Sequence, residues 1–348
     1  MSRRAALGRL YAWVAGSTLL GACDPREFAR RHGATQRLSV ATGGTGGVYY
    51  PYGGAIAAVI TRHVRNVEAT AEVTGGSIDN LKFIAQDQAD LGFTLADTLA
   101  DAYAGTGAFE TYGRVPAAAL ARLYTNYTHL VTVSDQRIAS LADLRDRIVS
   151  TGEPGSGTET IARRILQAAG IDPATDLRSR ALGAAGSVEA LRDGKIDAFF
   201  WSGGVPTGAL LDLASAPGQR MRLVANDAVL PALRERFGDE LYLPATIVAG
   251  AYPGIDEPIG VIGVANLLAA HRSMSADLAY EITRALFEHR AELLAVHPEA
   301  RHLEPGFASA GSPVPFHEGA VRYYRQSAAA GSRRVAAQGG ADGSSRHG

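Results

Sequence analysis

Cysteine is nearly absent from this chain: Cys23 is the only one among its 348 residues. A single cysteine can form no internal disulfide, and it cannot supply a cysteine-rich metal site. Lysine occurs only at Lys82 and Lys195, and the 34 basic residues are balanced by 35 acidic ones. This balance leaves no strongly basic surface of the kind that nucleic-acid binding requires, so we expect no nucleic-acid partner.

The sequence also lacks the short motifs of several common chemistries. No lysine follows its glycine-rich stretches, which excludes a phosphate-binding P-loop, and the glycine spacing does not match G-x-G-x-x-G. It contains no G-x-S-x-G nucleophile motif and no H-E-x-x-H zinc motif, and its nine histidines are not spaced like metal ligands. These absences predict a protein with no enzymatic activity, no metal and no cofactor.

The first residues have the pattern of a bacterial lipoprotein signal. Two arginines precede a short apolar core, Tyr11–Leu20, which is too short to span a bilayer. The sequence L-G-A-C that follows resembles a lipobox, which would leave Cys23 as the lipidated first residue. The alternative is an ordinary secretory signal with a chance cysteine. We expect a signal peptide over residues 1–22, a polar tether over residues 23–36 and an anchor on the extracytoplasmic face of the cell membrane.

A loop of glycine and threonine dominates the stretch Leu38–Val59, where it joins an apolar strand to a helix. Pro51 is suited to the first turn of that helix because its missing N–H has no intrahelical partner there. The loop brings backbone N–H groups and hydroxyls to a helix N-terminus, which is a favourable place for an anion. The alternative is a turn that merely connects strand to helix.

Part of the sequence pattern occurs twice. Thr74–Phe93 and Gly183–Phe199 both contain a Gly-Ser helix start, a short helix, a turn and a strand, with Ser77 and Ser187 placed as helix N-caps. The first glycine loop has its counterpart in Ser150–Thr158. Capped helices also recur by chance, but the full alternation predicts an α/β protein with mainly parallel sheets. Two such halves facing each other would direct four helix N-termini into one cleft.

These motifs resemble those of the TAXI family, the solute-binding proteins of one class of TRAP transporter. The family's opening signature, T-G-G-T-G-G-V-Y-Y-P-x-G-G, is matched by Thr42–Gly54. Weaker matches follow in the family's order at Thr74–Asn80, Asp90–Asp97, Ser140–Leu144, Gly155–Glu159, Asp193–Phe200, Leu286–His289 and Pro315–Tyr324. One departure is Leu95-Ala96, where the family often has a polar Gln-Ser pair.

The resemblance implies a two-lobed fold of the periplasmic-binding-protein type II, or Venus flytrap, class, with two crossover strands and a central ligand cleft. We expect lobe 1 to comprise residues 37–128 and 262–326 and lobe 2 to comprise residues 129–261. Residues 327–348 have scarcely an apolar anchor and are predicted to be a disordered tail. The resemblance further implies a monomeric receptor that delivers a small organic anion, either a glutamate-like amino acid or a dicarboxylate, to a TRAP permease.

The candidate ligand-binding residues come from both predicted lobes. They are Thr42, Gly44, Thr45, Gly46, Gly47, Tyr50, Thr74, Ser77 and Asp97 on one side, and Ser156, Gly157, Thr158, Trp201 and Gly203 on the other. The glycine loop would hold a carboxylate, Tyr50 would close over it, and Asp97 would accept from an ammonium group. Ser77 and Asp97 have the alternative role of helix capping, and Trp201 has that of a core or hinge residue.

Two other functions are compatible with parts of this pattern. A sensory lipoprotein that signals to a membrane kinase would have the same fold and ligand, and would differ only in its partner. An extracellular enzyme is the less favoured alternative, because nothing marks a catalytic pair of carboxylates.

Overall fold

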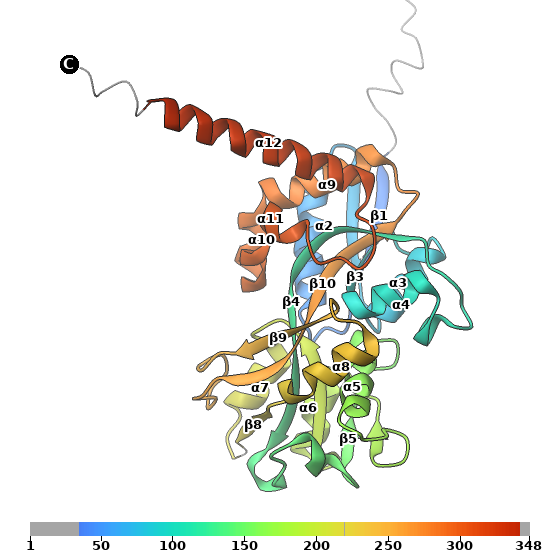
Figure 1. Cartoon of the computed structure of the whole chain (residues 1–348), viewed down its shortest axis with the longest axis vertical. Coiled ribbons are helices and arrows are strands. Elements are labelled where there is room, and N and C mark those ends of the chain that lie inside the picture. The colour runs from blue at the N-terminus through green and yellow to red at the C-terminus, as the bar shows by residue number, and fades with distance from the viewer. Residues whose placement is uncertain (1–34, 219, 342–348) are drawn as a thin grey trace, which may run out of the picture. The chain divides into compact units, whose positions relative to one another are not determined.

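The computed structural model describes residues 35–218 and 220–341, with side chains described as far as residue 330 (Figure 1). The predicted signal peptide, Cys23 and nearly all of the predicted tether lie outside these residues, as do the last seven residues of the chain. In the two described ranges, no helix combines the length and the apolar character needed to cross a membrane.

The described residues form one mixed sheet of ten strands. Its main path has the order β2-β1-β3-β10-β4-β7-β5-β6, while β8 pairs with β4 and β9 pairs with β10. The strands are β1 (Gln36–Ala41), β2 (Val67–Glu72), β3 (Leu91–Leu95), β4 (Ala117–Val133), β5 (Ile148–Ser150), β6 (Arg178–Arg180), β7 (Ala198–Gly203), β8 (Met221–Val224), β9 (Tyr242–Ile247) and β10 (Ile259–His271).

Helices connect the strands and form the C-terminal part of the described chain. They are α2 (Tyr49–His63), α3 (Ser77–Ala85), α4 (Ala96–Ala104), α5 (Gly157–Ala168), α6 (Ala184–Arg192), α7 (Gly208–Ser215), α8 (Leu230–Phe237), α9 (Ala276–Glu288), α10 (Arg290–Val296), α11 (Pro305–Ala308) and α12 (Glu318–Ala341). Short 3-10 helices are η1 (Gly107–Phe109), η2 (Ser134–Gln136), η3 (Leu141–Leu144), η4 (Asp227–Val229) and η5 (Pro298–His302).

The sheet contains the predicted repeat. In one half, β1 is parallel to its neighbours β2 and β3, and in the other half β5 is parallel to its neighbours β6 and β7. We call the half around β1 the first lobe and the half around β5 the second lobe. Each lobe has its own strand–loop–helix succession, so the carboxyl ends of β1 and β5 occupy equivalent places.

Two long antiparallel strands, β4 and β10, join the lobes (Figure 1). The first part of β10 pairs with β9 and its last part with β3, while β4 continues from its pairing with β10 to β7 and β8. Both strands are buried along most of their length, because their predominantly apolar residues are covered on both faces. The expected α/β fold with two lobes and two crossover strands is confirmed, while the residue limits of the lobes stay predictions.

Several local predictions differ from the structure. Helix α2 begins at Tyr49, two residues before Pro51, which is tolerated because all four first N–H groups of a helix lack intrahelical partners. Neither predicted serine cap is present: Ser77 is the first residue of α3, and Ser187 lies inside α6. Helix α12 extends to Ala341, and the predicted disorder of residues 327–348 stays a prediction. Alanine, arginine and glutamine in this stretch are strong helix formers.

His129 in β4 is completely buried where the lobes join. Its Nδ1 lies 2.9 Å from the Tyr127 carbonyl oxygen and 3.2 Å from that of Trp201, and its Nε2 lies 3.0 Å from the Tyr252 hydroxyl. The two carbonyls require a proton on Nδ1, so Nε2 accepts from Tyr252. Burial lowers the pKa of His129 to about 4.

This buried imidazole predicts a loss of stability in mild acid. Between pH 6.5 and about pH 4 the unfolded chain protonates His129 while the folded protein does not, so the free energy of unfolding falls as the pH falls. The contribution is up to about 3 kcal/mol. Urea denaturation at several pH values should show a weaker pH dependence for His129→Gln than for the wild type. Equal dependence in the two proteins would contradict the prediction.

Candidate ligand-binding site

A cavity with a volume of about 330 Å³ lies between the lobes. Its walls are the loops that follow β1, β2, β5 and β6, together with the end of β7. These loops lie at the carboxyl ends of parallel strands, where ligands bind in open α/β sheets. The volume is suited to a small molecule.

Four helices begin at the wall of this pocket. The lining includes the first residues or N-caps of α2, α3, α5 and α6, namely Tyr49, Ser77, Ser156 and Ala184. Unpaired N–H groups give each helix N-terminus a positive partial charge that favours an anion. The arrangement of helix starts expected from the sequence repeat is therefore present.

The four helix starts differ in whether other groups of the protein accept hydrogen bonds from their first N–H groups. Within the part of the chain that the structure describes, α2 and α6 have no side-chain cap. In α5 the Ser156 hydroxyl accepts from the Glu159 N–H at 3.1 Å. In α3 the first N–H groups donate across the lobes to the Gly155 carbonyl, at 3.0 and 3.2 Å. The start of α2 is therefore the place at which a ligand anion would gain most, because the start of α6 lies beside the Glu153 carboxylate.

A partly buried tyrosine lines the pocket on the side of the first lobe. The Asn266 side-chain N–H donates to the Tyr49 hydroxyl oxygen at 2.7 Å, and the Tyr49 ring stacks on Phe93 with centroids 4.9 Å apart. Burial raises the pKa of Tyr49 strongly, so its hydroxyl keeps its proton. Since Asn266 already donates to this oxygen, the Tyr49 hydroxyl is itself a hydrogen-bond donor.

Asn80 holds together three segments behind the pocket. Its buried amide donates to the carbonyl oxygens of Thr42 and Phe93 at 2.7 and 2.8 Å and accepts from the Thr74 hydroxyl at 2.6 Å. The Thr42 hydroxyl in turn donates to the Glu72 carbonyl oxygen at 2.6 Å. Thr42 and Thr74 thus support the loops from behind the pocket. The sequence predicts instead that these two residues contact the ligand.

The lobes approach so closely that glycine is required at two pocket positions. A Cβ atom on Gly47 would lie 2.8 Å from the Trp201 ring, and one on Gly157 would lie 2.6 Å from the Ser77 hydroxyl. Trp201 is held in place because its indole N–H donates to the Thr207 hydroxyl oxygen at 2.9 Å. The indole of the second lobe therefore lies against the glycine loop of the first.

Glu153 is the charged side chain among the described residues that line the pocket. Its carboxylate lies beside two glycines. A Cβ atom on Gly183 would be 2.8 Å from Oε2 of Glu153, and a Cβ atom on Gly44 would be 3.5 Å from the same oxygen. Partial burial raises the pKa of Glu153, and the negative charge of Asp79 adds a smaller increase. This acid is the site residue that the sequence analysis misses, although it lies inside the S-T-G-E-P-G-S-G-T loop.

The pocket brings together most of the residues predicted from the sequence. Those that line it are Gly44, Thr45, Gly46, Gly47, Ser77, Ser156, Gly157, Thr158, Trp201 and Gly203. The predicted residues Thr42, Tyr50, Thr74 and Asp97 are not part of its lining. Tyr49, and not Tyr50, lines the pocket, while the Tyr50 side chain is 39% exposed.

Asp97 belongs to a cluster of charges behind the pocket. It is completely buried in the first turn of α4, where it accepts from the Thr98 N–H at 2.7 Å and from the Tyr242 hydroxyl at 3.0 Å. The Arg164 guanidinium of α5 lies 3.7 Å from it and forms bonds of 2.6 and 2.8 Å with Asp101. Burial raises the pKa of Asp97 although Arg164 opposes the rise. Asp97 is thus paired with Arg164, and its predicted role as acceptor for a ligand ammonium group stays a prediction.

Solved structures with the same type of fold include two binding proteins. MatC from Rhodopseudomonas palustris with bound malate has 14% identity and a TM-score of 0.52, over 76% of this chain and 88% of that chain. PhnD1 from Prochlorococcus marinus in complex with methylphosphonate has 10% identity and a TM-score of 0.51, over 77% of this chain and 90% of that chain. At these identities the likeness shows the fold alone, which is that of periplasmic binding proteins.

The sequence itself matches a known family over most of its length. The match extends over residues 40–327, and so includes both lobes, both crossover strands and every residue that lines the pocket. This protein belongs to the NMT1-like family.

Proposed function

We propose that this protein is an extracytoplasmic solute-binding receptor that captures a small organic anion between its lobes and delivers it to a membrane permease. The observation that carries the proposal is the pocket itself, at whose wall α2, α3, α5 and α6 all begin. Binding of this kind needs no catalytic group, and we infer that the protein is not an enzyme. Malate and methylphosphonate, bound by the two proteins of similar fold, are small anions of the size that suits this pocket.

The placement of Glu153 favours an amino acid over a dicarboxylate. A ligand carboxylate near the start of α2 would leave the rest of a small ligand within reach of the Glu153 carboxylate, which lies beside Gly183 at the start of α6. A second negative charge there would be repelled, whereas an ammonium group would form a charge-assisted hydrogen bond. We infer that the ligand carries both charges.

The partner and the location are inferred from the sequence. The signature at Thr42–Gly54 favours a TRAP permease of the TAXI class as the membrane partner, and the lipobox-like sequence favours a lipid anchor at Cys23. We propose that a monomer tethered in this way remains next to its permease.

Thermal shift of the purified protein against a panel of small anions tests the proposed function. The panel contains glutamate, glutamine, 2-oxoglutarate, malate, succinate, pyruvate and branched-chain keto acids. A ligand present at 100 times its dissociation constant stabilises by about 2.7 kcal/mol, which raises the melting temperature by several degrees. No shift with any member of the panel would contradict capture of a small organic anion.

The variant Glu153→Gln tests the inferred ligand class. The amide keeps the shape of the side chain and removes its charge, so an amino acid is expected to bind about tenfold or more weakly, because hydrogen bonds to charged groups contribute about 1.5–3 kcal/mol. A dicarboxylate is expected to bind more tightly, since the repulsion is relieved. Isothermal titration of wild type and variant with the best ligand of each class measures both effects. Unchanged affinities would show that Glu153 does not face the ligand.

A further inference from the structure

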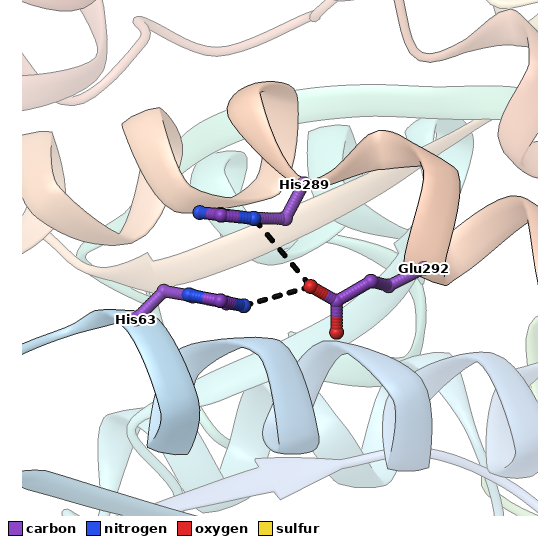
Figure 2. A group of neighbouring side chains, drawn as sticks. All are labelled: His63, His289 and Glu292. Carbon is purple, nitrogen blue, oxygen red and sulfur yellow. Dashed lines mark hydrogen bonds and ion pairs between the residues drawn. The ribbon is translucent and has the colours of Figure 1, made fainter.

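Two histidines and a glutamate meet on the first lobe, away from the pocket (Figure 2). His63 is the last residue of α2, His289 lies at the break between α9 and α10, and Glu292 is in the first turn of α10. None of the three lines the ligand pocket. Their side chains are 27–32% exposed, so they are accessible to a dissolved ion.

The three side chains converge on one oxygen atom. His63 Nε2 lies 2.7 Å and His289 Nδ1 lies 3.4 Å from Glu292 Oε1. Figure 2 shows the two imidazole rings lying parallel with the carboxylate at their edge, and their centroids are 3.3 Å apart with planes 5° from parallel. The three potential ligand atoms all lie within 4.8 Å of one another.

This spacing is close to what a tetrahedral metal requires. Nitrogen and oxygen ligands bind zinc at about 2.0–2.2 Å, which separates two ligands of a tetrahedron by about 3.4 Å. The distance between His289 Nδ1 and Glu292 Oε1 already has this value, and His63 Nε2 needs to move by less than 1 Å. Because the two rings lie in nearly parallel planes, both would have to tilt out of the stack for their nitrogen lone pairs to meet at a common point.

The surroundings of Glu292 support such a site. Its second oxygen, Oε2, pairs with the Arg62 guanidinium from the last turn of α2. Contacts of this kind to a ligating carboxylate fix its orientation and leave the other oxygen available. Partial exposure leaves a fourth position open to water, as in zinc sites with two histidines and one carboxylate.

We propose that His63, His289 and Glu292 bind one divalent transition-metal ion, of which zinc fits the ligand set best. When the ion binds, a neutral His63 would carry its proton on Nδ1, which leaves the Nε2 lone pair available to the metal. The ion would connect the end of α2 to the junction of α9 and α10 and so stabilise the first lobe without contacting the ligand.

Titration of zinc into the untagged, EDTA-treated full chain at about pH 7.5 tests the site. Competition with a chromophoric chelator should show one zinc ion bound with a micromolar or lower dissociation constant, and zinc should raise the melting temperature. His63→Ala and His289→Ala should each weaken binding at least tenfold and abolish the thermal shift. Glu292→Gln, which keeps the side-chain shape, should weaken binding as well.

His271→Ala is the matched control. This histidine also lies in the first lobe, at the end of β10, where it contacts Ser273 rather than a carboxylate. The variant should bind zinc like the wild type. Circular dichroism in EDTA establishes that every variant is folded before the titration. The proposal is overturned if the wild type binds no zinc ion stoichiometrically, or if folded His63→Ala and His289→Ala bind it as tightly as the His271→Ala control.

Discussion

Replacing Arg164 by alanine is expected to lower the free energy of unfolding by about 3–5 kcal/mol, the usual effect of removing one partner from a buried ion pair. Arg164 on α5 of the second lobe reaches two carboxylates on α4 of the first lobe, Asp97 and Asp101. Without the guanidinium, Asp97 would remain completely buried with no cation beside it, because the Tyr242 hydroxyl and the Thr98 N–H supply hydrogen bonds but no charge.

A neighbouring arginine provides the control for this prediction. Arg163 forms an ion pair of 2.9 Å with Glu159 on the surface of the same helix, and its side chain is 55% exposed. Because exposed pairs contribute about 0–1 kcal/mol, Arg163→Ala should have little effect. Urea denaturation of both variants measures the difference. If Arg164→Ala were no more destabilising than Arg163→Ala, the ion cluster would not hold the lobes together.

A further variant separates the ion pair from the packing of the arginine. The Arg164 guanidinium also lies over the Phe237 ring of α8, with its carbon 4.7 Å from the ring centroid. Asp97→Asn and Asp101→Asn introduced together with Arg164→Met remove every formal charge and preserve most of the volume. This triple variant should recover much of the lost stability, because replacing all members of a buried ion cluster is often nearly neutral.

The fold was accessible from the sequence because its strongest signals are local. A strand, a glycine-rich loop and a helix follow one another twice within short stretches, and each loop lies at the carboxyl end of its strand whatever the rest of the chain does. The ligand pocket follows from the same local pattern, since the loops after β1 and β5 both line it. This is why Thr45 and Ser156, both predicted from residue patterns, are part of the pocket lining.

The residues that the structure places differently from the sequence expectations have partners that are distant in the sequence. Asp97 is directed away from the pocket by Arg164 and by Tyr242, which is 145 positions away. Ser77 is not a cap because its hydroxyl instead accepts from the Leu95 N–H at 3.1 Å, from the neighbouring strand β3. Local patterns specify that a polar side chain is needed at such positions, but its partner depends on tertiary packing.

The metal-ligand cluster is the clearest case of a feature without a local signal. His63 and Glu292 are 229 positions apart, and His289 reaches them because the helical stretch over 276–296 breaks at this residue into α9 and α10. The sequence favours one continuous helix there because its apolar stripe is uninterrupted. The break, with φ −111° and ψ 25° at His289, is set by packing and by no proline or glycine.

Filling the pocket from either lobe is expected to weaken ligand binding at least a hundredfold, or by about 2.7 kcal/mol. Thr45 of the first lobe and Ala185 of the second both line the pocket and are exposed, and their loops meet where a Cβ atom on Gly46 would lie 3.2 Å from the Ala185 Cβ atom. In Thr45→Trp and in Ala185→Trp, an indole would occupy the cavity or hold the lobes apart. Isothermal titration with the best ligand of the panel measures the loss.

Substitutions at Thr45 and Ala185 should change ligand affinity without changing stability, which is not expected at Ser156. The Ser156 hydroxyl caps α5 and also donates to the Glu153 carbonyl oxygen at 2.6 Å. A large residue at Ser156 would remove both hydrogen bonds and would destabilise the protein as well as block the pocket. Because Thr45 and Ala185 are exposed, the tryptophan variants should melt within a few degrees of the wild type when no ligand is present.

Thr45→Ser and Ala185→Ser should bind like the wild type. Full affinity in both tryptophan variants would place the ligand outside this pocket, whereas its loss in both would mean that one molecule is enclosed by the two lobes together.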